Sequence, residues 1–365
     1  MERKLASVQV IISLESIEGA DKIMKATVLG WELVVLKNEF KVGDKCVYME
    51  VDSILPEKKE FEFLRSKKFR IKTIRLRGQV SQGICFPLSV LPKCKYGDGS
   101  SDYYEEGDDV TKALGVRKYD PQAEAELREL ERRNAIHNNR LRKYFMKYPW
   151  YRRLILKPQR LRRPSFVKKT DEDRIQLFPR ICEEEKGTQF FATEKLDGTS
   201  ASYFVIKKGF RNRYGVCSRN YQLTKKDNVY WRVSNKLGID KILKQLMKLY
   251  GVDMVLIQGE IIGPKVQGNK YKLDELELYI FNLKIGHIWY TDPLSIRDML
   301  WNNFNIVPEV DDAYVLPETI PQAVETAVGR STLADVPREG LVIRNAEKHI
   351  SFKIINPKFL LKYDE

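Results

Sequence analysis

Short apolar and alternating runs divide the first 95 residues into predicted strands. The runs lie at residues 7–11, 25–29, 33–36, 45–51 and 70–76. Turn-forming glycines stand among them, at Gly19, Gly30, Gly43 and Gly78. About five short strands at this spacing are typical of a small β-barrel.

The hydrophobic pattern changes in the middle of the chain. Residues 100–109 are acidic and polar and predict a loop. Residues 121–133 carry Ala, Leu and Glu at helical spacing behind a capping Asp120, and they predict a linker helix.

From about Arg174 to the end, strand-like runs dominate, with helices expected at 241–250 and 295–301. The predicted fold class is therefore α+β, with antiparallel sheets flanked by helices in the C-terminal part. The pieces at 17–23 and 41–44 resemble segments of OB-fold nucleic-acid-binding modules. We expect three parts: an OB-type β-barrel at 1–110, a linker with a helix and a basic stretch at 111–170, and a C-terminal domain at 171–365.

Composition narrows the class of protein. The chain has 365 residues, 43% of them hydrophobic, which is enough for about two domains with substantial cores. No apolar run approaches the length of a membrane span, and the N-terminus lacks a signal-peptide pattern, so we expect a soluble, intracellular protein. Five scattered cysteines and three histidines indicate neither structural zinc, nor a disulfide framework, nor histidine-based catalysis.

The formal net charge of +14 is concentrated in one stretch. Residues 132–169 contain 14 Lys or Arg and no Asp or Glu, which leaves equal numbers of basic and acidic residues elsewhere. The stretch also contains Tyr144, Phe145, Tyr148, Trp150 and Tyr151. Cations interleaved with aromatic rings favour nucleic-acid contact over a merely solvated run or a nuclear-localisation patch.

The sequence Lys-Leu-Asp-Gly at 195–198 ends a predicted strand and carries the clearest candidate chemistry. Lys195 is a candidate covalent nucleophile, for which burial and neighbouring groups must depress the pKa of the amine. Asp197 would orient the amine or a sugar hydroxyl, and Gly198 would leave room for a nucleotide near the backbone. The alternative is an ordinary Asp-Gly turn.

Further blocks, each an apolar strand with a polar residue at its end, follow in order. They lie at 217–220, 258–263, 278–282, 338–343 and 351–355. The ordered set resembles the signature of the covalent nucleotidyltransferases, and the whole chain is similar to the ATP-dependent RNA ligases that carry an OB-type module before the catalytic domain.

The resemblance implies a role for each block. Lys195 matches the nucleophile that takes AMP from ATP, and Arg219 matches a residue that contacts phosphate or ribose oxygens. Glu260 matches an acidic residue near the ribose and the metal-bound waters. Phe281 matches the aromatic that stacks on adenine, although core packing is an equal interpretation, and Tyr279 is the alternative stacking residue.

The last blocks match the metal and phosphate ligands of the family. Glu339 matches the carboxylate that holds Mg²⁺ or Mn²⁺ through water, together with Glu260. Lys353 matches the lysine that neutralises the α-phosphate, and Arg174 matches an upstream arginine near the nucleotide. The family often has a second lysine where this chain has Ile355, and Lys358 is the candidate substitute. Asp197 and Gly198, described above with Lys195, complete the predicted site residues.

The resulting prediction is an ATP-dependent RNA ligase that joins 3′-hydroxyl and 5′-phosphate ends or nicks through lysyl-AMP and an adenylated 5′ end. Its partners are RNA and ATP, and no membrane association or oligomer is indicated. The alternatives are a DNA nick ligase and a non-catalytic RNA-binding protein with a degenerate ligase domain. We also expect neutralisation of Arg152, Arg153, Arg162 and Arg163 to weaken nick binding without affecting autoadenylation.

Overall fold

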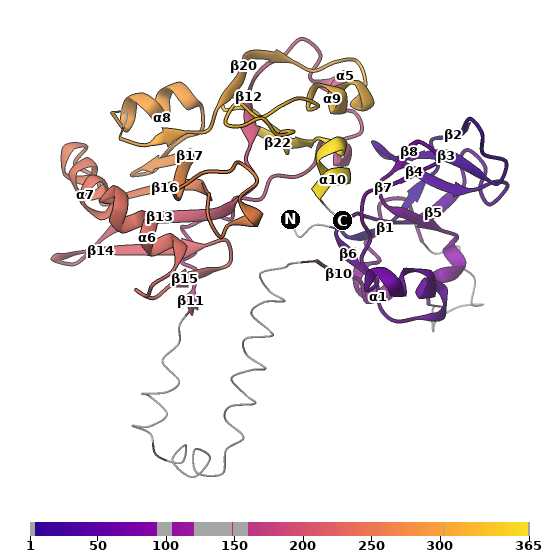
Figure 1. The fold of residues 1–365 in the computed structure, drawn as a ribbon, viewed down its shortest axis with the longest axis horizontal. Helices are drawn as coiled ribbons and strands as arrows, with labels where there is room; N and C mark the ends of the chain where they lie inside the picture. Colours follow the sequence, from indigo (N-terminus) through magenta and orange to yellow (C-terminus); the bar gives the residue numbers. More distant parts are fainter. Residues whose placement is uncertain (1–3, 93–103, 120–147, 149–159, 302, 364–365) are drawn as a thin grey trace. The chain divides into compact units, whose positions relative to one another are not determined.

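The computed structural model describes residues 4–92, 104–119, 148, 160–301 and 303–363 (Figure 1). The chain forms two compact units. One comprises residues 1–152 with 176–179 and 360–365, and the other comprises 153–175 with 180–359. The predicted helix at 121–133 and the aromatic residues of the basic stretch other than Tyr148 lie outside the described residues.

The first unit is built from short strands around one apolar core. Its sheets are β1 (Ala6–Val10), β5 (Lys45–Met49) and β9 (Ile84–Phe86); β2 (Ser13–Ser16), β3 (Ile23–Val28) and β4 (Trp31–Leu36); β7 (Ile74–Leu76) and β8 (Gln79–Ser81); and β6 (Ser53–Ile54) and β10 (Arg117–Lys118). Short helices accompany them: η1 (Lys59–Lys67), η2 (Leu88–Val90) and α1 (Thr111–Leu114). In β4 the alternating Trp31, Leu33 and Val35 are buried, as the period of two requires.

Most of the strands expected in this unit are confirmed. The run at 70–76 is the exception, because only Ile74–Leu76 is a strand. Lys68 and Phe69, just before the run, both have positive φ, so the chain turns there. Arg70 forms a single bridge with Ile54, and the continuous strand begins at Ile74.

The second unit contains two sheets. The larger has eight strands in the order β11 (Arg160–Arg162), β15 (Tyr221–Leu223), β14 (Arg211–Ser218), β13 (Thr199–Lys208), β16 (Met254–Ile262), β17 (Glu277–Ile285) and β18 (Ile288–Tyr290), with β19 (Asn305–Ile306) paired to β17. Helices α6 (Val229–Leu237), α7 (Ile239–Leu249) and α8 (Pro293–Met299) contribute to the core on one side of it. The helices predicted at 241–250 and 295–301 are thus confirmed within two residues.

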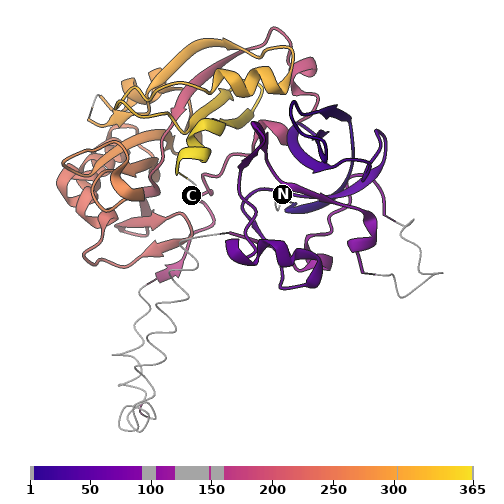
Figure 2. The ribbon, with the colours of Figure 1, turned by 45° about the vertical axis from the view of Figure 1, so that its right-hand side comes forward.

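The smaller sheet brings distant parts of the sequence together. Its order is β20 (Glu309–Val315), β12 (Gln189–Lys195), β21 (Gly340–Asn345) and β22 (Ile350–Ile355). The pink strand β12 lies among the orange and yellow strands in both views (Figures 1 and 2). The remaining helices are η3 (Ile175–Leu177), α5 (Ile181–Glu184), η4 (Gln267–Asn269), α9 (Ile320–Thr326) and α10 (Pro357–Tyr363).

The two sheets of this unit are joined directly. β12 of the smaller sheet ends at Lys195, and after three intervening residues β13 of the larger sheet begins at Thr199. The α+β class with antiparallel sheets and helices in the C-terminal half is confirmed. Among the described residues, none of the helices is both long and apolar enough to cross a bilayer.

Candidate active site

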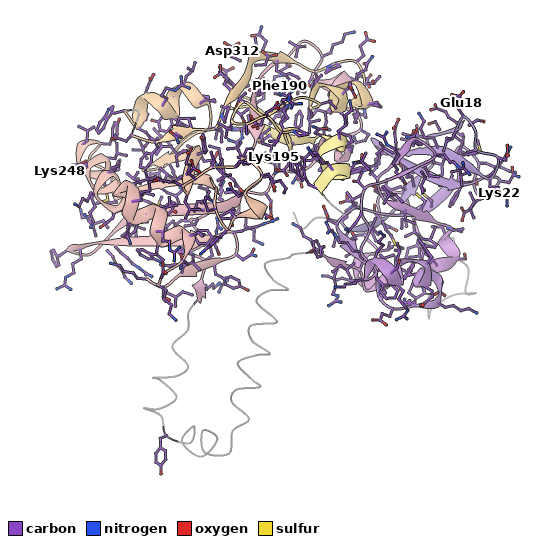
Figure 3. The ribbon with its side chains drawn as sticks, in the orientation of Figure 1. Glu18, Lys22, Phe190, Lys195, Lys248 and Asp312 are labelled. Carbon is purple, nitrogen blue, oxygen red and sulfur yellow. The ribbon has the colours of Figure 1, made fainter. Side chains whose placement is uncertain are left out.

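Lys195 lies at the junction of the two sheets (Figure 3). It pairs in register with Gly340, which places it beside Glu339 at the start of β21. The Nζ atom of Lys195 lies 2.5 Å from Oε1 of Glu339 and donates a hydrogen bond to it. The first candidate pair, 144 residues apart in sequence, is therefore in direct contact.

The environment raises, rather than lowers, the pKa of the Lys195 amine. Burial alone would lower this pKa, but the carboxylates of Glu339, Glu260 and Asp197 outweigh it and hold the amine in its charged form. The expectation of a depressed pKa is therefore wrong in this structure, because the strand end gathers carboxylates around the amine. Lys195 must give up a proton before it can act as a nucleophile.

The same cluster of buried charged groups also shifts the pKa values of Glu260 and Glu339, the two acidic residues assigned to metal binding. Burial raises the pKa of Glu260 to about 8, with neighbouring carboxylates adding to the effect and Lys195 opposing it. Burial also raises the pKa of Glu339, although Lys195 and Lys353 favour its charged form. Each carboxylate would be stabilised by additional positive charge.

Glu339 also has an oxygen suited to a divalent cation. Its Oε2 atom is buried and has no hydrogen-bond partner among the described residues. In the described part of the chain, no group of three or more His, Cys, Asp or Glu side chains could hold a metal alone. A magnesium site built from one or two carboxylates, water and phosphate oxygens fits this donor set.

Asp197 is engaged by other partners than Lys195. Its carboxylate forms an ion pair with Lys270, and its backbone N–H donates to the hydroxyl of Tyr271 over 2.8 Å. Gly198 is required by packing. A Cβ there would lie 2.3 Å from the carbonyl oxygen of Ile261, so the missing side chain allows β16 to pack closely against this turn.

A short segment before β12, residues 171–174, links three other candidates. Asp171 accepts from Arg219 over 2.6 Å, and the carbonyl of Asp173 accepts from the N–H of Lys353 over 2.8 Å. Arg174 forms a parallel bridge with Lys353 and is itself buried. The structure therefore brings Arg174, Arg219 and Lys353 to one segment.

Phe281 is held by a residue that sequence reasoning missed. Arg344 donates to the carbonyl of Phe281 over 2.8 Å and to Oδ1 of Asn282 over 2.9 Å, while its guanidinium carbon lies 5.8 Å from the Phe281 ring centroid. A further bond of 2.8 Å to Glu172 anchors Arg344. Phe281 and Tyr279 both pack in the cluster that contains Leu196, but Tyr279 is buried and Phe281 only partly so.

Two further missed residues support the backbone of the site. Asn356 is buried; its N–H donates to the carbonyl of Glu339 over 2.9 Å and its side chain to that of Arg338 over 2.8 Å. Arg163 donates to the carbonyls of Ser218 and Arg219 over 2.7 and 2.5 Å. No local pattern marks such residues, because their partners are distant in sequence.

Arg163 also changes the interpretation of the basic stretch. Its remaining hydrogen bonds go to the carbonyls of Val167 and Lys168 and to the hydroxyl of Ser202. The guanidinium is thus engaged by the protein itself, so of the four arginines Arg163 fits the expected role in nick binding least. Arg162 is exposed, while Arg152 and Arg153 lie outside the described residues.

Lys358, the candidate substitute for the second lysine of the family, has only weak support as a site residue. Ile355 is buried at the end of β22, with 3% of its surface exposed, so it belongs to the core. Lys358 is exposed on α10, and its backbone N–H donates to Oδ1 of Asn356 over 2.9 Å.

Comparisons with known proteins find similar proteins over the whole chain. A family model described as an OB-fold domain matches residues 5–88, and one described as RNA ligase matches residues 188–363. The structure of Naegleria gruberi RNA ligase with PPi is 30% identical, with a TM-score of 0.76, and the match covers 99% of each chain. A mutant of the same ligase with ATP and Mn is 29% identical, with a TM-score of 0.77 and the same coverage. A mutant with AMP and Mn is 28% identical, with a TM-score of 0.75 and again 99% coverage of each chain. No curated protein gives a significant match.

Proposed function

Because the chain belongs to the ATP-dependent RNA ligase family, we propose that it joins a 3′-hydroxyl end to a 5′-phosphate end of RNA through an AMP linked to Lys195. The observation that carries this reaction is the position of Lys195, at the junction of two sheets and in hydrogen-bond contact with Glu339. ATP and a divalent metal are the cofactors.

The proposed reaction has three steps. The neutral amine of Lys195 attacks the α-phosphorus of ATP, forming a P–N bond while the bond to the bridging oxygen breaks and pyrophosphate leaves; the attacking nitrogen loses a proton to solvent. An oxygen of the RNA 5′-phosphate then attacks the same phosphorus, the P–N bond breaks, and the Lys195 nitrogen takes back a proton. Finally the oxygen of the 3′-hydroxyl attacks the 5′-phosphate and loses its proton to solvent, while the bond to the AMP oxygen breaks and AMP leaves with the bonding electrons.

The residues around Lys195 have distinct proposed roles. Glu339 accepts the hydrogen bond that orients the amine. Lys353 and Arg219 would offset phosphate charge, and Arg174 would support them. Phe281 is the proposed stacking residue for adenine because its ring is only partly buried. Glu339 and Glu260 would hold the metal through water, and the metal would supply positive charge to the phosphates.

The RNA is proposed to contact the N-terminal module and the basic linker as well as the catalytic domain. Residues 1–110 would act as the nucleic-acid-binding module and 111–170 as the basic linker, with catalysis in 171–365. The match over the whole chain is to an RNA ligase, so neither a DNA nick ligase nor a non-catalytic RNA-binding protein is favoured. Nicked duplex RNA is the proposed substrate.

Replacement of Lys195 tests the proposed chemistry. After incubation with magnesium and ATP labelled at the α-phosphate, the native protein should retain label on a denaturing gel. Lys195→Ala and Lys195→Arg should show none, since arginine stays protonated. Lys248→Ala, an exposed lysine on α7 labelled in Figure 3, is the matched control and should label normally. Equal labelling of Lys195→Ala would disprove the assignment.

A further inference from the structure

Within the described residues, one face of the larger sheet packs against helices, and the apolar cluster on its other face contains no helical residue. Tyr203 and Val205 of β13 pack in the core that contains α6 and α7. Side chains alternate along a strand, so Ser202 and Phe204 point to the opposite side. Phe204 packs there against Leu256, with Phe166 and Trp289 beside them. We call this side the helix-free face.

The catalytic end lies on the same helix-free face. Register pairs Ser200 with Glu260 and Ser202 with Gln258, and paired side chains share a face. The side chain of Gln258 donates to the hydroxyl of Ser202 over 3.1 Å, which confirms their common side. Glu260, a proposed metal ligand, therefore lies on the same side of the sheet as the far end of β13. Between the two, Ser202, Phe204 and Leu256 are buried, with Phe166 and Val167 packed in the same cluster.

The far end of this face is basic. Lys208 pairs with Arg211 across the β13–β14 turn, and Ile206 pairs with Arg213, so all three cations lie on the helix-free face. Lys284 of β17 also belongs to it, since it pairs with Leu256. Lys208, Arg211 and Arg213 are exposed. Figure 1 shows β13 and β14 extending side by side away from β12, toward the left of the view.

Aromatic rings accompany these cations. Phe210, in the turn itself, is fully exposed at 109% of its reference surface, an unusual position for a phenylalanine in water. Trp289 lies on the helix-free face, with the ammonium of Lys284 5.3 Å and that of Lys168 5.9 Å from its ring centroid. Cations beside planar apolar surfaces are the composition of a nucleic-acid-binding surface.

The surrounding sequence contains no acid to neutralise this end. From residue 198 to residue 226 there is no Asp or Glu, while the basic residues are Lys207, Lys208, Arg211, Arg213, Arg219, Lys225 and Lys226. Within the described residues, Lys207 is the hairpin cation that pairs with a carboxylate, that of Asp253. The other three cations remain available for phosphate.

We propose that the basic end of the helix-free face binds one duplex arm of the RNA substrate. Lys208, Arg211, Arg213 and Lys284 contact phosphates, and Phe210 packs against the sugar surface. Eight residues separate Ser200 from Lys208, which corresponds to about 26 Å along a strand. At the roughly 3.4 Å per base pair of a B-form duplex this is about eight base pairs from the reacting ends, and slightly more for the shorter rise of an A-form RNA helix. The inference rests on the proposed function.

The test compares two variants of equal charge change. The first is Lys208→Ser, Arg211→Ser and Arg213→Ser on the helix-free face. The control is Lys241→Ser, Lys244→Ser and Lys248→Ser, three exposed lysines of α7 on the helix-covered side. Binding to nicked duplex RNA is measured against salt concentration, with arms either shorter or longer than eight base pairs, and autoadenylation is measured without RNA.

On long arms the first variant should bind about tenfold or more weakly than the control. Its slope of log K against log salt should become less steep by about two to three units. On short arms it should match the control, and autoadenylation should be normal. Equal binding of both variants to long arms would overturn the inference. Loss on short and long arms alike would also overturn it, since the contact would then lie at the reacting ends. If the native protein showed no autoadenylation, the proposed function itself would be refuted.

Discussion

The catalytic site and the hairpin end of the helix-free face handle positive charge in opposite ways. At the catalytic site, which we call the paired end, cations are paired with carboxylates, as in Lys195 with Glu339 and Arg344 with Glu172. At the hairpin end, Lys208 and Arg211 have no carboxylate partner in the described part of the chain. The difference teaches that chemistry requires charge held in one geometry, whereas duplex binding requires charge that is free to meet phosphate.

The paired end should therefore be sensitive to single substitutions, whereas the hairpin end should tolerate them. Replacing one member of a partly buried pair leaves the other charge uncompensated. Replacing an exposed cation leaves the protein's own contacts unchanged. Substitutions at each end can sharpen or break this contrast.

Glu339→Gln should have the largest effect of the substitutions outside Lys195. The amide can still accept a hydrogen bond from Lys195, but it removes the negative charge and the buried oxygen suited to a metal. We expect autoadenylation to fall by about 10²–10³-fold, as for loss of one electrostatic contact in an active site. The initial rate of AMP transfer measures this.

The matched control for that substitution is Glu347→Gln, an exposed glutamate in the turn between β21 and β22. It should keep the native rate. If Glu339→Gln also kept it, the paired end would be structural and its contrast with the hairpin end would fail.

Arg344→Lys should have an intermediate effect. Lysine cannot reach the carbonyl of Phe281, Oδ1 of Asn282 and the carboxylate of Glu172 together, so the Phe281 ring would lose its support. We expect KM for ATP to rise by about tenfold, while kcat changes less, because adenine binding is weakened rather than phosphate chemistry. Steady-state adenylation kinetics separate the two constants.

Phe281→Ala provides the comparison for Arg344→Lys. If Arg344 acts through Phe281, the double variant should be no worse than Phe281→Ala alone. Additive losses would show that Arg344 acts independently of the ring.

Much of this architecture could be predicted from the sequence, because strands and polar strand ends are local patterns. The helix expected at 241–250 is found at Ile239–Leu249, and Lys195 ends a strand as its pattern predicted. Glu339 was assigned from the family resemblance, and the structure places it in contact with Lys195. Asn356 and Arg344 could not be found, because their contacts depend on tertiary pairing; Arg344 and Glu172 are 172 residues apart. The expected direction of the Lys195 pKa shift was wrong for the same reason, since Glu339 and Glu260, two of the carboxylates that raise it, are distant in sequence.

The smallest effects are expected at two neighbouring arginines that the sequence treats alike. Arg163→Ala removes hydrogen bonds to the carbonyls of Val167, Ser218 and Arg219. We expect this to lower the free energy of unfolding by about 2–3 kcal/mol. Arg162 is exposed, so Arg162→Ala should change stability by less than about 0.5 kcal/mol. Urea unfolding of both variants measures the difference.

RNA binding should reverse the order of these two arginines. An exposed cation of the basic stretch that contacts one phosphate accounts for about one unit of the salt dependence, so Arg162→Ala should lower that slope by about one. Arg163→Ala should leave the slope unchanged at temperatures where the variant is folded, because its guanidinium already binds the protein's own carbonyls. Equal slopes for the two variants would mean that hydrogen-bond commitment does not decide which cations are available to RNA, and the contrast between paired and free charge would not extend to the basic stretch.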